Sequence, residues 1–358
     1  MLLPGPEALQ LAIYLGWKLH GIRGGLVAGL GFILPAVLLL FALSYVYVAH
    51  GSQPWIAGLL FGLKAAVVAL VVQAIVRIGR RALRTPLHVA LAIASFLALE
   101  FAGVPFPLVL LVAAIVGVAT SRTAAAAPLI AANPTHAAQS RKVAAAGLVL
   151  WLLPWLLVVA TLGSSSLWSR VYLFFTKAAL VTFGGAYAVL GYVTTQLVDR
   201  FAWVTAEQSV AGLALAETTP GPLVIVLQFM GFMAGWNEPG PLTPLGSALL
   251  AGLLATWATF LPSFVFILLG APYVERLTGN PRVEAALGAI TAAVVGVIAT
   301  LGLLLAEVVL LPGGWSAAPD WRATVLAAAS WFALERVRWP LPWVLVAAAL
   351  AGLLLRLL

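Results

Sequence analysis

Two copies of a Pro-Gly-Pro tripeptide are the residues in this sequence best suited to bind an ion, at Pro4-Gly5-Pro6 and Pro220-Gly221-Pro222. Each proline removes a backbone donor and disfavours helical geometry in the residue before it, so a helix breaks there. Where the helix resumes, free N–H groups and the positive end of the helix dipole favour an anion. One copy would indicate a structural kink or a surface loop. Two copies leave a functional break and a structural kink both open.

A different kind of break is predicted at Phe183-Gly184-Gly185, inside the apolar run 171–198. These glycines fit either a broken helix that faces Pro-Gly-Pro or close helix packing through small residues. Lys177 lies two helical turns before Gly184. A cation at membrane depth is costly and marks a candidate site, so Lys177 could neutralise part of an anion. The alternative is an ammonium that reaches the membrane surface, and this explanation is stronger for Lys64.

Glu217 is the candidate for carrying a coupling proton, because it directly precedes Thr218, Thr219 and Pro220 and could share a site with the anion. The alternative is an ordinary polar residue at a helix end. Two further glutamates each end an apolar run, which favours helix termination; they are Glu100 and Glu335. Candidate oxyanion donors are Gln10, Gln228, Thr176 and Thr182.

Other chemistries find little support in the sequence. The absence of cysteine excludes disulfides, thiolate metal sites and cysteine nucleophiles. The four histidines are scattered near the ends of apolar runs without ligand spacing, so we expect no metal site. A nucleotide-binding loop and a nucleophile arrangement are both missing, which leaves ATP-driven transport and enzymatic turnover unsupported. We therefore expect neither a cofactor nor an enzyme.

Membrane helices must position these residues. Hydrophobic residues make up 63% of the 358 and charged residues only 8%, whereas a soluble domain carries about 25% charged residues. Lipid must therefore surround the chain, and the apolar runs predict about eleven to thirteen helical membrane segments. The net charge of +8 comes from short basic clusters between apolar runs, as in cytoplasmic loops. Nucleic acid is excluded as a partner, because no soluble basic domain is present to hold it.

The sequence is a two-fold repeat. Residues 170–219 precede the second Pro-Gly-Pro, but only three residues precede the first, so we expect the start of the N-terminal half to be missing. The segments that match in order are ASFLALEFAGVPFP (94–107) with ASWFALERVRWPLP (329–342), AAVV at 65–68 with 292–295, and Leu34-Pro35 with Leu261-Pro262.

Charge predicts that the two repeats have opposite orientations. Apart from Lys64 and Lys177 inside apolar runs, only Arg170, Arg322 and Arg356 fall outside the basic loops, so the matched regions of Arg84 and Arg322 face opposite sides. Inverted repeats with broken helices at their interface are typical of transporters. We expect an all-α polytopic membrane protein with an N-terminal repeat (1–122), a cytoplasmic linker (123–142) and a C-terminal repeat (143–358). The loops taken as cytoplasmic are 18–25, 77–85, 121–142, 199–206, 271–282 and 335–340.

Three segments closely resemble the chromate transporter family. FFTKAALVTFGGAYAVLGYV (174–193) and GLALAETTPGPLVIVLQFMGFMAGW (212–236) are similar to its C-terminal half. LLPGPEALQLAIYLGWKLHGIRGG (2–25) is similar to its N-terminal half from Pro-Gly-Pro onward. The chain departs from the family pattern in one respect, since the first Phe-Gly-Gly segment expected before Pro4 is absent.

The resemblance implies a secondary transporter that exports chromate, or a similar tetrahedral oxyanion, across the bacterial inner membrane and confers chromate resistance. Proton motive force is the implied driving force, and a second copy of the chain is a candidate partner. The alternatives are a transporter of sulfate or another oxyanion and an inactive truncated membrane protein. The implied substrate-binding residues are Phe183, Gly184, Gly185, Pro220, Gly221, Pro222, Pro4, Gly5 and Pro6, to which the charge argument adds Lys177.

Overall fold

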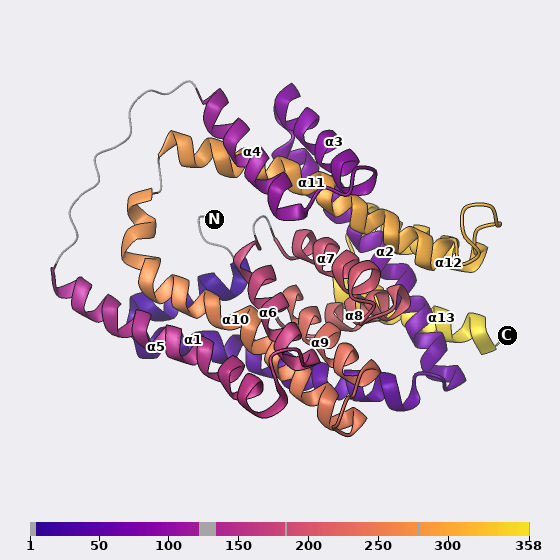
Figure 1. Cartoon of the computed structure of the whole chain (residues 1–358). Helices are drawn as coiled ribbons and strands as arrows, with labels where there is room; N and C mark the ends of the chain where they lie inside the picture. Colours follow the sequence, from indigo (N-terminus) through magenta and orange to yellow (C-terminus); the bar gives the residue numbers. More distant parts are fainter. Residues whose placement is uncertain (1–4, 122–133, 183–184, 278–279, 358) are drawn as a thin grey trace.

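The computed structural model describes residues 5–121, 134–182, 185–277 and 280–357. Within these ranges the chain forms thirteen α-helices and no β-strand (Figure 1). Short π-helical turns extend α7 at Gln196–Arg200 and α12 at Ala333–Val337, and a 3₁₀ turn precedes α9 at Leu223–Ile225. The helices are α1 (Glu7–His50), α2 (Pro54–Ala82), α3 (Pro86–Glu100), α4 (Phe106–Thr120), α5 (Pro134–Leu162), α6 (Leu167–Leu180), α7 (Ala186–Thr195), α8 (Ala206–Glu217), α9 (Val226–Asn237), α10 (Pro244–Leu277), α11 (Pro281–Leu310), α12 (Trp321–Phe332) and α13 (Leu341–Leu357).

Five helices in the described ranges are long and apolar enough to cross a bilayer. They are α2 and α11 over their whole length, α5 over Lys142–Leu162, α10 over Pro244–Gly270, and α1, whose apolar run Glu7–His50 is broken at His20 and Gly21. Large apolar side chains stay exposed along α5, among them Leu148, Val149 and Leu157 at 56–59%. A face of this kind suits lipid rather than water. The expected fold class, an all-α polytopic membrane protein, is confirmed.

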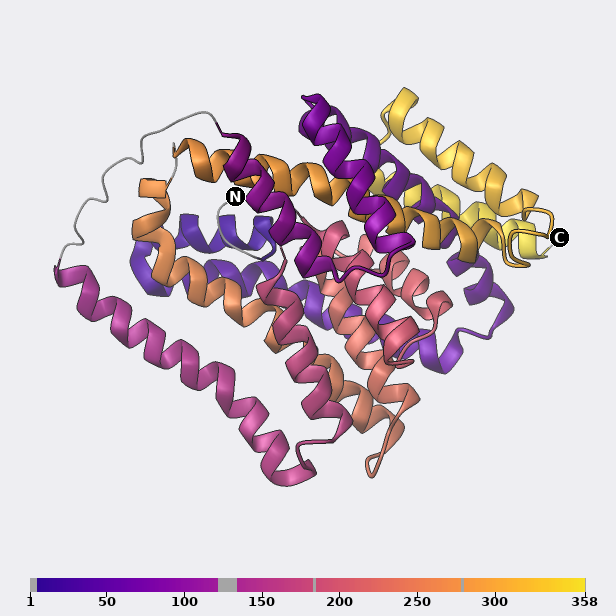
Figure 2. The same cartoon turned by 45° about the horizontal axis from the view of Figure 1, so that its top comes forward.

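The short helices α6–α9 occupy the centre of the molecule (Figures 1 and 2). Their large side chains form the innermost core, since Phe175, Phe229 and Phe232 are all 0% exposed. Helix α10 packs on α6 and α9, while α2 packs on α8 and α11 packs on α7. The breaks between the short helices therefore lie within protein, where irregular backbone is tolerated at membrane depth.

Two ends of the molecule are distinguished by their cavities. Gly51, Glu207 and Pro312 line one cavity, and we name this the pocket end. Arg80, Arg81 and Arg338 line another cavity, and we name this the arginine end. Helix α2 begins just after Gly51 and ends at the arginines, so it runs from the pocket end to the arginine end.

Contacts between the two repeats confirm that they are inverted. Helix α11, the counterpart of α2, ends beside Pro312 at the pocket end and therefore runs the opposite way. Each repeat also packs on the other: Gly352 of α13 lies against Gly62 of α2, and Gly117 of α4 lies against Ala289 of α11. The spacing of the matched segments pairs Gly117 with Gly352 and Gly62 with Ala289, so the two contacts obey the same symmetry as the sequence. The division of the chain at 123–142 stays a prediction, since residues 122–133 lie outside the described ranges.

Helix α1 is a hairpin of two helices that meet at His20 and Gly21. Gly21 has φ +64°, a left-handed conformation that glycine adopts without strain. The two segments then fold back on each other, which brings the backbone of Gly16 against that of Gly24. The same arrangement joins α9 to α10, where Gly235 lies on the backbone of Ser247. In both repeats, a short helix that follows Pro-Gly-Pro thus turns into a long spanning helix.

The loop 199–206 lies at the pocket end, whereas 77–85 and 335–340 lie at the arginine end. The prediction that these loops share one side of the membrane is therefore wrong. The Arg170 guanidinium sits 5.5 Å from the ring of Trp203, and Asn237 donates a hydrogen bond to the Trp203 carbonyl at 2.9 Å. The reason is helix length. Helix α6 has 14 residues, and α7 has 10 that continue into a π-helical turn of 5, so each reaches about 20 Å, less than the ~30 Å of a hydrocarbon core. The chain turns back at the break between them, and α8 and α9 form a second hairpin of the same kind.

Candidate functional site

The first Pro-Gly-Pro break lies against α10 and the end of α6. The Gly5 N–H donates to the Thr182 carbonyl at 2.9 Å. Gly5 has φ +132°, and a Cβ atom built on it would lie 2.5 Å from Oγ of Ser263 and 2.6 Å from Nε2 of Gln10. Only glycine fits this conformation in this space. Pro6 then caps α1 in an extended conformation, whereas Pro4 lies outside the described residues.

Buried polar side chains line this first break. Gln10 and Thr182, both predicted as oxyanion donors, are 5% and 3% exposed beside Gly5. Ser263 and Thr259 are 0% and 2% exposed, and their hydroxyls have no hydrogen-bond partner among the described residues. They stand one turn apart on the same face of α10. Unpartnered buried hydroxyls are costly, which makes these two candidates for binding a ligand.

Ser263 is not among the residues predicted for the site, although the internal repeat contains a signal for it. Ser263 follows Pro262, and Ala36 follows the matched Pro35. The match predicts equivalent positions, and the structure places Ser263 on Gly5 just as it places Ala36 on Gly221. Each Pro-Gly-Pro break therefore packs on the long helix of the other repeat.

The second Pro-Gly-Pro break joins α8 to α9. Gly221 has φ +153°, and a Cβ atom built on it would lie 2.6 Å from Cβ of Ala36. Pro220 and Gly221 keep exposed surface, while Pro222 is buried and begins the 3₁₀ turn. Nearby, Gln228 of α9 donates to the carbonyl of Val37 at 2.9 Å. Both breaks thus combine a glycine with positive φ, a close helix from the other repeat and a buried glutamine.

The glycine break before α7 is linked to the second Pro-Gly-Pro break. Gly185 has φ +108° and caps α7, and a Cβ atom built on it would meet nothing within 4 Å. Two residues later, the Tyr187 hydroxyl donates to Oε1 of Glu217 at 2.7 Å. Glu217 is the last residue of α8, so this hydrogen bond joins the two breaks. Phe183 and Gly184 lie outside the described residues.

Lys177 is exposed on α6, where it shares a face with Leu173 and Leu180. No other described residue forms an ion pair with it. Its role at the breaks therefore stays a prediction. Thr176, the neighbouring candidate donor, instead accepts a hydrogen bond from the Trp151 indole at 3.3 Å.

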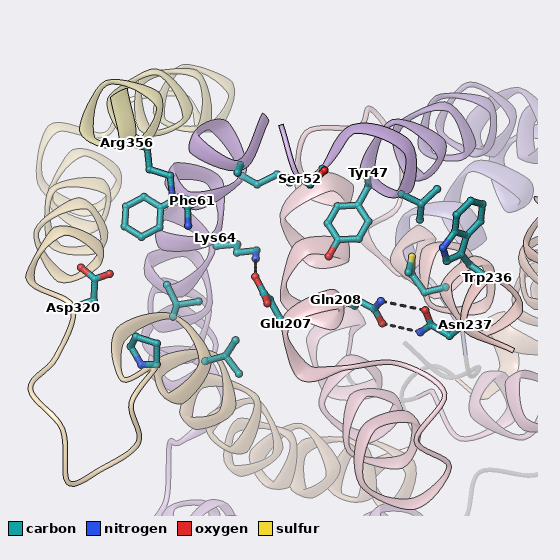
Figure 3. Close-up of a pocket in the computed structure, with 18 residues that line it drawn as sticks. Tyr47, Ser52, Phe61, Lys64, Glu207, Gln208, Trp236, Asn237, Asp320 and Arg356 are labelled. Carbon is teal, nitrogen blue, oxygen red and sulfur yellow. Dashed lines mark hydrogen bonds and ion pairs between the residues drawn. The ribbon is translucent and has the colours of Figure 1, made fainter. Parts of the chain in front are cut away.

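A cavity of about 560 Å³ opens at the pocket end, between α2, α8, α9 and α11. Its best-defined contact is an ion pair from Lys64 of α2 to Glu207 of α8, with Nζ 2.7 Å from Oε1 (Figure 3). The hydrogen bond from Lys64 holds the pKa of the Glu207 carboxyl below its usual value. Lys64 therefore finds a charged partner inside the protein instead of reaching a membrane surface.

The matched glutamates Glu100 and Glu335 have unlike surroundings. Glu335 accepts from Arg80 at 3.2 Å at the arginine end. Glu100 lines a separate cavity of about 560 Å³ together with Asp199 and Glu307. The pair therefore does not form one symmetric site.

Broken helices at the centre of two inverted repeats define a polytopic membrane protein of transporter architecture. A family model described as chromate transporter matches residues 1–118 and 169–353. The chain belongs to the chromate transporter family.

Several curated relatives are similar over most of the chain, whereas no solved structure matches it. A chromate transport protein of Pseudomonas aeruginosa is 36% identical over 310 residues, which cover 86% of this chain and 69% of the relative. A probable chromate transport protein of Synechococcus elongatus is 29% identical over 98% of this chain and 82% of the relative. A chromate transport protein of Cupriavidus metallidurans is 28% identical over 86% of this chain and 70% of the relative.

Proposed function

We propose that this protein exports chromate across the bacterial inner membrane through the breaks at its centre. The observation that carries the proposal is the matched pair of Gly5 and Gly221, each with positive φ and each packed on the long helix of the other repeat. Such breaks expose backbone donors at the positive ends of short helices, which suits an anion at membrane depth. The names of the curated relatives support chromate as that anion.

The first break offers the fuller set of donors for a tetrahedral oxyanion. The hydroxyls of Ser263 and Thr259 have no other partner in the described chain, and the amide of Gln10 adjoins Gly5. Lys177 and the breaks at Gly185 and Pro220-Gly221-Pro222 complete the proposed site from the second repeat. Hydroxyl and amide groups can turn toward an oxyanion without adding fixed charge.

The membrane potential favours export of a dianion. Each elementary charge that crosses 100 mV is worth about 2.3 kcal/mol, so an inside-negative membrane helps to expel two negative charges by roughly twice that amount. Glu217 is our candidate for coupling the cycle to protons. Its hydrogen bond with Tyr187 links the glycine break to the Pro-Gly-Pro break. Protonation of Glu217 would change this hydrogen bond and so affect both breaks.

Chromate accumulation in cells tests the proposal. Cells that make the protein should accumulate less chromate than matched cells that make the Gly221→Ala variant. Equal accumulation, with both proteins present in the membrane, would contradict export. Sulfate, which shares the charge and shape of chromate, should compete for the same route; if sulfate is moved and chromate is not, the protein is a sulfate transporter.

A further inference from the structure

Lys64 places a positive charge inside the protein, well below the start of its helix. It stands ten residues after Pro54, which begins α2, or about 15 Å along the helix. Its side chain is 15% exposed, whereas that of its partner Glu207 is 72% exposed. The ammonium is therefore fixed in the protein, and its carboxylate partner borders open space.

The surrounding cavity is suited to a small anion. Its volume of about 560 Å³ leaves room for an oxyanion with several waters, each of which occupies about 30 Å³. Tyr47 brings a hydroxyl to its wall, where the amides of Gln208 and Asn237 are hydrogen-bonded to each other (Figure 3). The guanidinium of Arg356 adds a second cation, held 5.8 Å from the ring of Phe61.

The two carboxylates that line the cavity, those of Asp320 and Glu207, have different kinds of partner. Asp320 is committed to its own helix, because Oδ1 accepts the backbone N–H groups of Arg322 and Ala323 at the start of α12. Among the described residues, the Glu207 carboxylate forms an ion pair with Lys64 alone. Glu207 is therefore the carboxylate that is free to leave the ammonium when another anion arrives.

We propose that Lys64 is a second oxyanion-binding residue, at the pocket end of the route, and that Glu207 competes with the oxyanion for its ammonium. This inference rests on the proposed function. Helix α8 connects the cavity that contains Lys64 with the second Pro-Gly-Pro break. Glu207 lies in its first turn, and Glu217 ends it beside the break. An oxyanion that leaves the break toward the pocket end meets Lys64 about 15 Å further on.

Competition explains why a transporter would pair a binding lysine with a glutamate. A dianion outweighs one carboxylate while both are near the ammonium, because its charge is greater. Glu207 is tethered, however, and keeps a high effective concentration when the oxyanion begins to leave. The pair re-forms and the oxyanion is released. A site on a route must bind strongly enough to be entered and weakly enough to be left.

The alternative is an ion pair that only fastens α2 to α8. Removal of either charge would then have the same effect, and exchanging the two charges would restore function. The proposal predicts different effects. Lys64→Gln removes the ammonium and weakens oxyanion binding. Glu207→Gln removes the competitor, so the oxyanion binds more tightly and leaves more slowly.

Chromate flux in liposomes containing the purified protein distinguishes competition for the Lys64 ammonium from a purely structural ion pair. Lys64→Gln should raise the half-saturating chromate concentration by about tenfold, which is what a charged hydrogen bond of ordinary strength is worth. Glu207→Gln should lower both the half-saturating concentration and the maximal rate, and Lys64→Arg should retain binding. The matched control is Glu238→Gln, which removes an ion pair to Arg170 (3.8 Å) at the same end but outside the cavity, and it should behave as the unmodified protein.

Equal kinetics for Lys64→Gln and Glu207→Gln, or full rescue by the exchange Lys64→Glu with Glu207→Lys, would overturn the inference. A direct measurement keeps it separate from the proposed function. Sulfate binding to the detergent-purified protein can be followed by equilibrium dialysis with radiolabelled sulfate. Lys64→Gln should weaken this binding and Glu207→Gln should strengthen it, whether or not the protein moves chromate. Unchanged binding in both variants would also overturn the inference.

Discussion

Two glycines determine the chemistry of the site at the scale of single residues. Gly5 and Gly221 both have positive φ, and a Cβ atom built on either would lie 2.5–2.6 Å from a neighbouring side-chain atom. Sequence alone could locate them, because proline and glycine act on the backbone wherever they occur. The repeat marks Ser263 only as the counterpart of Ala36, and nothing in the sequence marks Glu207, since the importance of both comes from neighbours distant in the chain. Such contacts exist only after the helices have packed.

The first prediction concerns Gly221→Ala. The added methyl would strain a backbone at φ +153° and push against Ala36, so we expect a loss of about 1–3 kcal/mol in stability and a large loss of transport. The control is Gly31→Ala on α1, the helix on which Gly221 packs, because a Cβ atom there meets nothing within 4 Å. Thermal unfolding in detergent measures the first effect and chromate flux the second. A Gly221→Ala protein as stable and as active as the control would refute this account of the break.

A second prediction separates space from charge around the glycine break. Gly185→Leu should abolish transport, because the side chain would occupy open space where we expect backbone to meet ligand. Lys177→Gln should weaken oxyanion binding and leave the protein inserted, with Lys142→Gln, an exposed lysine on α5, as the control. Binding can be measured by sulfate titration. Wild-type binding and transport by Lys177→Gln would remove Lys177 from the site.

At the scale of helices, small residues at symmetric positions determine which helices pack closely. Matched glycines let α13 approach α2 and α4 approach α11 with backbones nearly in contact. The internal repeat in the sequence predicted the two helix pairs as counterparts. It did not predict that each helix packs on the other repeat. Matching segments identify equivalent helices, but they do not identify the helices that are in contact. The hairpin α6–α7 was missed for a different reason. The charge of one loop does not reliably predict its side of the membrane when the preceding helix turns back before it has crossed the bilayer.

A third prediction tests these helix contacts. Gly62→Ala should cost about 1–3 kcal/mol, since the methyl would collide with the carbonyl of Ala348 on α13. Gly117→Ala should cost a similar amount, because its methyl would lie 2.5 Å from the carbonyl of Ala285. Gly288→Ala on α11 is the control; nothing lies within 4 Å of the added atom, so it should be neutral or stabilise by up to about 1 kcal/mol. Unfolding midpoints in detergent that fail to rank the variants in this way would contradict the packing.

At the scale of the whole molecule, the two central hairpins open toward the same end. The sequence contains no cysteine, so single cysteines can report this directly. Arg200→Cys and Ser52→Cys should react with a membrane-impermeant thiol reagent from the same side of the membrane, and Arg84→Cys from the opposite side. The three positions are exposed, which makes accessibility the deciding factor. Labelling of Arg200→Cys together with Arg84→Cys would restore the loop 199–206 to the cytoplasmic side.

The central claim is that an oxyanion crosses through the matched breaks of two inverted repeats. Its most direct test is the initial rate of chromate movement across liposomes that contain the purified protein and carry an imposed membrane potential. We predict a rate well above that of protein-free liposomes, which rises with the potential because a dianion moves. Gly5→Ala and Gly221→Ala should each reduce it by about tenfold or more, the effect of a barrier raised by 1.4 kcal/mol or more. No flux from folded, unmodified protein, or undiminished flux from both glycine variants, would contradict the account.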